Sequence, residues 1–309
     1  MSRSASTGGL PCSNDAFFHV LTFLNPMDCR NLDRTSSVLK NKKCFQHSFY
    51  KSITRLAADG YSLSEVALHH VLNIPSAMVG GDFVLAALLA RSGEEVRSNG
   101  TQMDVYVATQ HEEDVNNILE TLTKQLFDCN IICQRQHTHS STINDGDYST
   151  DRTTSQTTFF TTNTLINSIS GYGLINIIAT HTWTVTYPGK HLVSVDHLKR
   201  FDIIATQVGF YKRSEDILIH FEDGTIEDIV ALTLRISDAR INFIRASAKQ
   251  TLNDGLYHVG ITLDRFLQYF SRGFDDNDTR GSKYTYYLVK RLMSDHRREK
   301  RRFWWGRIA

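Results

Sequence analysis

From Ala77 onward, short strand-like segments alternate with longer helical ones, and this alternation is the feature that most limits how the chain can fold. Helices repeat apolar residues at three- and four-residue spacing, whereas strands are alternating or continuously apolar over a few residues. A first strand is expected at Ala77–Val79, followed in sequence by a Gly-Gly turn. The next expected elements are a helix at Phe83–Ala90, a strand at Met103–Ala108, a helix at Glu112–Phe127 and a strand at Cys129–Gln134. This order predicts an α+β domain in which helices flank a mixed sheet.

The pattern continues less regularly in the second half of the chain. His137–Gln156 is rich in Ser, Thr, Asn and Asp and has little periodicity, so we expect a surface loop there and a strand near Thr157–Thr162. Further strands are expected at Leu174–Ala179, Ile203–Val208 and Ile217–Phe221, and further helices at Val193–Arg200, Ile226–Leu234 and Thr262–Phe270. The segment Tyr284–Arg302 is predicted to be a basic helix.

Residues 13–73 differ from the rest because they show only helical patterns. A polar lead is followed by an apolar helix, which Asn25-Pro26 ends, and a second helix begins near Pro26 with Asp28 in its first turn. Two more helices are expected at Cys44–Ala58 and Leu63–Leu72. The predicted organisation is a flexible lead over 1–12, a helical region over 13–73, a sheet domain over 74–280 and a basic C-terminal helix or tail over 281–309.

The start of the helical region resembles the F-box. That family shows a Leu-Pro pair, an apolar helix ending in Phe-Leu, and a Pro-x-Asp turn into a second helix. The matching residues here are Leu10, Pro11, Phe17, Leu21, Phe23, Leu24, Pro26 and Asp28. The family's usual Trp is absent, and Phe45 can take its place. The resemblance implies docking on a Skp-type linker subunit of a cullin ubiquitin ligase; the alternative is that these are the first helices of one larger domain.

A second set of residues concerns nucleotide transfer, which requires a divalent metal held between triphosphate oxygens and protein carboxylates. A strand reading Asp-x-Asp places both carboxylates on one face. A preceding Gly-Gly turn lets backbone N–H groups approach the phosphates. Here Gly80-Gly81 precedes a strand in which Gln102 stands at the first carboxylate position and Asp104 at the second.

This arrangement resembles the nucleotidyltransferase-like proteins of large DNA viruses and fungi. Phe201-Asp202 resembles their Phe-Asp strand, which implies Asp104 and Asp202 as catalytic and metal-binding carboxylates and Gly80 and Gly81 as phosphate-binding residues. The segment 262–274 resembles their closing Arg…Lys-Tyr…Arg-Gly-Phe helix, with Gln268 at the usual Lys position.

The neutral amide of Gln102 is a poor ligand for a hard cation. We therefore expect a degenerate, inactive nucleotidyltransferase-like domain that binds a target or ligand, with no cofactor or with weakly bound Mg²⁺. The alternative is an active metal-dependent nucleotidyltransferase that uses Asp104 and Asp202.

The densest basic and aromatic stretch lies at the C-terminus. It contains Arg297, Arg298, Lys300, Arg301 and Arg302, followed by Phe303, Trp304 and Trp305. Because the net charge of the chain is only +1, attraction to polyanions is expected from this stretch alone. It can pair with phosphates of nucleic acid or of an anionic membrane, which would suit a viral nucleic-acid- or membrane-associated protein. The alternative is a solvated basic helix whose aromatic residues pack back on the domain.

Other classes of site are disfavoured. The five cysteines are irregularly spaced, which argues against a disulfide framework. Cys129, Cys133, His137 and His139 lack the spacing of common zinc fingers. No apolar run reaches the roughly 18 residues of a transmembrane helix. The sequence therefore favours a cytoplasmic or nuclear F-box-type adaptor that presents an unknown target protein to a ubiquitin ligase.

Overall fold

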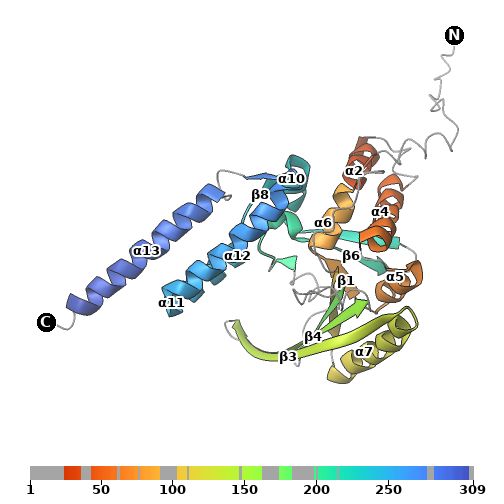
Figure 1. Ribbon diagram of the computed structural model, residues 1–309, viewed down its shortest axis with the longest axis horizontal. Coiled ribbons are helices and arrows are strands. Elements are labelled where there is room, and N and C mark those ends of the chain that lie inside the picture. The colour runs from red at the N-terminus through yellow and green to blue at the C-terminus, as the bar shows by residue number, and fades with distance from the viewer. Residues whose placement is uncertain are drawn as a thin grey trace, which may run out of the picture. The chain divides into compact units, whose positions relative to one another are not determined.

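The computed structural model describes residues 24–35, 43–60, 63–75, 77–90, 103–109, 111–145, 148–161, 174–182, 198–199, 201–213, 216–276 and 282–305 (Figure 1). The chain divides into two compact units. The first consists of residues 1–63 with 86–98, and the second of residues 64–85 with 99–309.

The first unit is helical and contains α2 (Pro26–Thr35), α4 (Cys44–Arg55) and a short π-helical turn, η1 (Leu56–Gly60). The predicted helix start at Pro26 is confirmed. The Asp28 N–H donates to Asn25 Oδ1 at 2.8 Å, and the Asn25 N–H donates back to Asp28 Oδ2 at 3.3 Å. This reciprocal pair satisfies two backbone donors at the helix end. Cys29 and Cys44 are buried where α2 and α4 pack together.

Seven strands of the second unit form one sheet in the order β3-β4-β5-β2-β1-β6-β7. The strands are β1 (Ala77–Gly80), β2 (Met103–Thr109), β3 (Ile131–Asp145), β4 (Tyr148–Thr161), β5 (Ile175–Thr182), β6 (Val208–Arg213) and β7 (Asp216–Phe221). The neighbours β2 and β5 are parallel, and every other neighbouring pair in this sheet is antiparallel. The predicted mixed sheet flanked by helices is therefore confirmed.

The centre of the sheet is buried on both faces. Met103, Val105 and Val107 alternate with Tyr106 and Ala108 along β2, and all five side chains are buried. Helix α7 (Glu112–Phe127) has the predicted bounds and packs on β2, β3 and β5. Figure 1 shows it beside β3. Helix α5 (Glu65–Leu72) packs on α7, and α6 (Asp82–Leu89) follows the Gly-Gly turn.

The predicted surface loop over His137–Gln156 is wrong. The described residues of this segment belong to the long antiparallel hairpin β3–β4, whose register runs from Ile131 opposite Thr161 to Asp145 opposite Tyr148. A strand ladder is held by backbone hydrogen bonds, and β-branched Thr favours extended backbone, so the segment needs no apolar alternation. The predicted strand Ile203–Val208 is also shifted, because Ile204–Thr206 forms the 3₁₀ turn η2 and β6 begins at Val208.

After the sheet the chain is mainly helical. It forms α10 (Thr225–Ala231), α11 (Asp238–Gln250), α12 (Leu252–Phe270) and α13 (Ser282–Trp305), with a small parallel pair β8 (Thr233–Leu234) and β9 (Asp275–Asp276). Three of the helices share a core made of Ile244, Val259, Leu288 and Leu292. The predicted helix at 262–270 is the C-terminal half of α12, and the predicted basic helix corresponds to α13.

Candidate functional site

Asp104 lies near the start of β2 and faces an amide on the neighbouring strand. In the register of β2 and β5, Asp104 is paired with Asn176. Asn176 is buried, and its Nδ2 donates a hydrogen bond to Asp104 Oδ1 at 2.9 Å. The Thr158 hydroxyl on β4 donates to Asn176 Oδ1 at 3.4 Å, so both ends of the amide are engaged. The group that faces Asp104 from the parallel strand is therefore neutral.

The Gly80-Gly81 turn beside this pair is closely covered by side chains. Gly81 has φ +78°, and a Cβ there would lie 2.9 Å from Cζ of Phe201. A Cβ on Gly80 would lie 2.8 Å from Leu198 and 3.2 Å from the Tyr106 ring. The Gly81 N–H donates to the Val208 carbonyl at 2.9 Å. Both glycines thus permit close packing, and the Gly81 donor already has a backbone partner.

Tyr106 and Phe201 form the apolar cover of this region. Their rings meet edge to face with centroids 5.9 Å apart, next to Met78 and Leu198. Burial raises the pKa of the Tyr106 phenol well above its ordinary value, and the nearby Asp104 charge raises it further. The phenol is therefore neutral at physiological pH.

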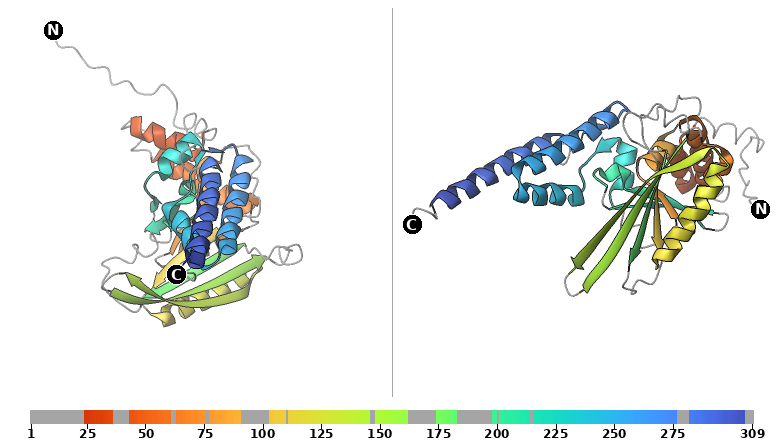
Figure 2. Two further views of the ribbon diagram at one scale, coloured as in Figure 1. Left: turned by 90° about the vertical axis from the view of Figure 1, so that its left-hand side faces the viewer. Right: turned by 60° about the horizontal axis from the view of Figure 1, so that its bottom comes forward.

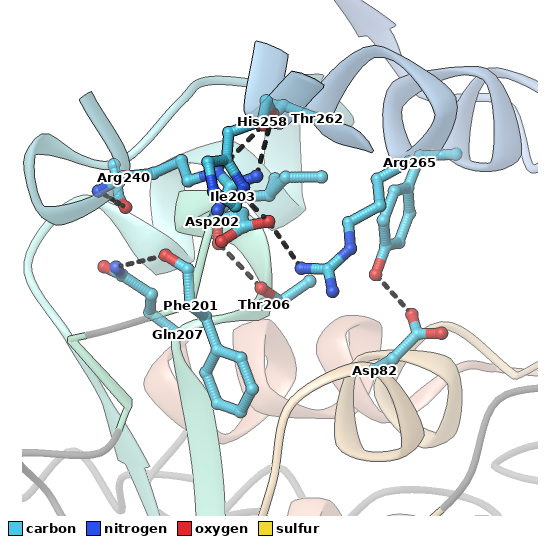
Figure 3. A network of polar contacts seen from close by, with 12 residues as sticks. Asp82, Phe201, Asp202, Ile203, Thr206, Gln207, Arg240, His258, Thr262 and Arg265 are labelled. Carbon is cyan, nitrogen blue, oxygen red and sulfur yellow. Dashed lines mark hydrogen bonds and ion pairs between the residues drawn. The ribbon is translucent and has the colours of Figure 1, made fainter. Parts of the chain in front are cut away.

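Asp202 is held by two arginines from the C-terminal helices. Arg265 Nη1 lies 2.6 Å and Arg240 Nε 3.5 Å from Asp202 Oδ2 (Figure 3). Arg240 also donates to Thr262 Oγ1 at 3.0 Å and to the His258 carbonyl at 2.8 Å. Burial lowers the pKa of the Arg240 guanidinium, and the Asp202 charge partly opposes this shift.

The backbone around Asp202 is fixed as well. Its carbonyl accepts from the Ser237 N–H at 2.9 Å, at the N-cap of α11. Gln207 Nε2 donates to the carbonyls of Lys199 and Phe201 at 3.1 and 3.2 Å. The segment that carries Asp202 is therefore held by the nearby Gln207 side chain and by the backbone of Ser237, 35 residues further along the chain.

Asp82, at the first position of α6, is the second carboxylate that the C-terminal helices contact. The Tyr269 hydroxyl donates to Asp82 Oδ1 at 2.5 Å. Arg272 binds both carboxylate oxygens, at 2.8 and 3.4 Å, and its guanidinium lies 5.1 Å from the Tyr269 ring centroid. Burial first, and then Asp82, raise the pKa of the Tyr269 phenol well above its ordinary value.

The residues Arg265, Tyr269 and Arg272 define what we term the α12 clamp. They are spaced four and three residues apart, which places them on one side of the helix and its C-terminal turn. They are also the Arg, Tyr and Arg of the closing-helix pattern, whereas Gln268 between them is exposed. Asp82 and the clamp residues were not singled out as site residues by the sequence; the pattern identified the helix, but not its carboxylate partners.

The expected carboxylates are thus engaged separately, Asp104 with an amide and Asp202 with two arginines. Within the described ranges, no group of three or more His, Cys, Asp or Glu side chains is arranged to hold a metal ion. Gln102 lies outside the described residues.

The remaining predicted residues are dispersed. In the first unit Pro26 is buried, Leu24 packs against Cys29 and Cys44, and Asp28 is half-buried in the capping pair. Leu10, Pro11, Phe17, Leu21 and Phe23 lie outside the described residues. Arg297 and Arg298 are exposed on α13, and Lys300, Arg301 and Arg302 continue the same helix. No helix in the described part of the chain has the length and apolarity needed to cross a bilayer.

Comparisons with known proteins return little. No protein-family model and no curated protein matches the sequence. Among solved structures, the chain is similar to a CCA-adding enzyme determined in complex with ATP, with 13% identity and a TM-score of 0.39. The match covers 79% of this chain and 45% of the enzyme chain, so this protein spans less than half of that enzyme.

Proposed function

We propose that residues 74–280 form a nucleotidyltransferase-like domain that does not transfer nucleotides and serves as a binding scaffold, and that the N-terminal F-box-like segment docks on a Skp-type linker subunit. The observation that carries the first part is the hydrogen bond from Asn176 to Asp104. An amide stands opposite Asp104, where a metal site would need a second carboxylate.

Charge supports the same proposal. Mg²⁺ is bound by hard oxygen ligands, and catalysis with two metals needs several carboxylates around them. Asn176 contributes no charge, and the carboxylate of Asp202 is already paired with Arg240 and Arg265. A single carboxylate hydrogen-bonded to an amide would give at most a weak cation site.

The decisive experiment replaces the amide by a carboxylate. Asn176→Asp places a second carboxylate opposite Asp104, and the double variant adds a third acidic residue through Gln102→Asp. We expect both variants to melt at a lower temperature than wild type without metal, because the new carboxylate at position 176 then faces the like charge of Asp104. Mn²⁺ should reverse that loss, since saturation at about 100 times Kd stabilises a protein by about 2.7 kcal/mol. Wild type and Asp104→Asn should show no comparable response.

Activity provides the opposing test. Wild-type chain is incubated with each labelled nucleoside triphosphate, Mg²⁺ or Mn²⁺, and protein and RNA acceptors. Label transfer that disappears in Asp104→Ala would refute the proposal and establish an active nucleotidyltransferase instead.

The adaptor part needs a variant that leaves the first unit folded. Because Pro26 is buried and Leu24 packs in the Cys29–Cys44 cluster, replacing these two residues would disturb folding as well as binding. We choose Phe17→Ser with Leu21→Ser, tested only if its circular dichroism matches that of wild type, and Asn31→Ala on the exposed side of α2 as the control. Wild type and the control should capture a purified Skp-type subunit, and the double variant should not. Absence of capture by wild type would exclude the adaptor role.

A further inference from the structure

Helix α13 has an inner face that is used for packing and an outer face that is not. Thr285, Leu288 and Leu292 are buried, and the two leucines share a core with Ile244 of α11 and Val259 of α12. Figures 1 and 2 show α13 alongside α12, with its C-terminal part reaching past the α11–α12 pair. The aliphatic side of the helix is therefore buried against its neighbours.

Two tyrosines begin the outer face. The exposed fractions of Tyr286 and Tyr287 are 58% and 64%. Their ring centroids are 6.1 Å apart and the planes are inclined by 61°, so the rings do not stack on each other. Lys290 Nζ lies 4.6 Å from the Tyr286 ring centroid. The Arg291 side chain is 70% exposed, and its Nε lies 4.0 Å from Asp295 Oδ2 one turn further along the helix. Aromatic surface and cations thus lie together on the first turns of α13.

Further cations continue along the same helix. Arg297 and Arg298 are exposed, and no carboxylate among the described residues pairs with either of them. Lys300, Arg301 and Arg302 follow in the sequence of α13, which contains eight Lys and Arg residues against two acidic ones. With a rise of about 1.5 Å per residue, the distance from Tyr286 to Arg302 along the helix is about 24 Å, enough to follow several nucleotides.

We propose that the outer face of α13, defined by Tyr286, Tyr287, Lys290, Arg291, Arg297 and Arg298, binds single-stranded nucleic acid. Cations spaced along the helix would contact phosphates, and the tyrosines would stack on bases, which is a mode of binding with little sequence preference. Duplexes are poorer ligands because their bases are already stacked. A membrane-surface helix needs a free apolar face, and the aliphatic face of α13 is already packed against α11 and α12.

The salt dependence of binding follows from this geometry. Contact with about five phosphates gives a slope of about −3.5 in log affinity against log salt for a single strand, so a fourfold rise in salt should weaken binding by about 100-fold. Loss of two stacking residues should weaken binding by about tenfold or more at constant salt.

The test uses the full chain and the fluorescence anisotropy of labelled 20-nucleotide oligo-U RNA and its DNA counterpart, with a duplex and phosphatidylserine vesicles as competitors. Tyr286→Ala with Tyr287→Ala removes the stacking surface, and Tyr257→Ala removes a tyrosine on α12 that is 67% exposed. Arg297→Gln with Arg298→Gln removes charge, and Arg297→Lys with Arg298→Lys retains it. We expect the Tyr286/Tyr287 double variant and the Arg→Gln double variant to bind weakly. Tyr257→Ala and the Arg→Lys double variant should bind like wild type.

Preference for the RNA or the DNA strand would identify which nucleic acid is bound, and either result supports the proposal. Equal binding by wild type and the Tyr286/Tyr287 variant would overturn it, because a general polyanion surface would then suffice. Stronger competition by vesicles than by single strands would assign the face to membranes and would also overturn it. So would the absence of binding at low salt. None of these outcomes depends on the Asp104–Asn176 pair.

Discussion

Replacing Asp202 by Asn should destabilise the second unit substantially. The Asp202 and Arg240 side chains are only 11% and 10% exposed, and their charged atoms are 3.5 Å apart. Removing one partner of a buried ion pair typically costs about 3–5 kcal/mol, because the remaining charge is left uncompensated. Asn keeps a hydrogen-bond acceptor at this position, so we expect the lower limit, about 3 kcal/mol. At about 2–4 °C per kcal/mol for a unit of this size, the melting temperature should fall by about 6–12 °C.

The matched control replaces Arg265, the other arginine that contacts the Asp202 carboxylate. Arg265 lies closer to Asp202, at 2.6 Å, but its side chain is 49% exposed. Solvent screens such a pair, so Arg265→Gln should cost about 1 kcal/mol or less. Thermal and urea unfolding followed by circular dichroism at 222 nm would compare the two variants with wild type.

Equal losses in the two variants would refute this reasoning, because burial and not proximity is expected to determine the cost. A loss below about 1 kcal/mol in Asp202→Asn would also refute it, since the charge would then be dispensable.

Three further predictions concern single positions. Gly81→Ala should lower the free energy of unfolding more than Gly273→Ala does. Both glycines have positive φ, but of the two only Gly81 would bring its new Cβ against a neighbour, the Phe201 ring. The difference between the two variants therefore measures the cost of that clash. Burial raises the pKa of the Asp228 carboxyl above its ordinary value of 3.8, so the folded state holds this proton to a higher pH than the unfolded state does. The wild-type protein therefore loses stability as the pH rises above about 4. Urea titrations at increasing pH should show Asp228→Asn gaining stability relative to wild type. Asn25→Ala should lower the stability of α2 by about 1 kcal/mol, measured as faster hydrogen exchange of its amides, and unchanged exchange would mean that the capping pair contributes nothing.

Helices and strands were predictable from the sequence where apolar residues recur at one clear spacing. The helix Glu112–Phe127 has its predicted bounds because its apolar positions recur at helical spacing between polar ones. The β3–β4 hairpin was missed because its Ser and Thr residues resemble a loop in composition. Helix α11 was missed as well, although Ser237 caps it by accepting from the Arg240 N–H.

The site was less predictable because its contacts join distant parts of the chain. Asp104 was found from the Gly-Gly and strand pattern, but its partner Asn176 is 72 residues away and faces it only because β2 and β5 are neighbours. A polar residue between Ile175 and Ile177 was the available signal. Asp202 was also identified, but the arginines that neutralise it come from α11 and α12, and sequence spacing does not reveal that pairing.

The α12 clamp also has a consequence for how the chain acquires its structure during synthesis. Asp82 is separated from Tyr269 by 187 residues and from Arg272 by 190. At about 5–20 residues per second, the ribosome completes that interval about 10–40 s after Asp82 has been made. Throughout this time the carboxylate at the start of α6 lacks its phenol and guanidinium partners, so the second unit can reach its final form only after α12 has left the ribosome. A nascent chain arrested before Leu252 should accordingly remain open to proteases that no longer cleave the finished protein.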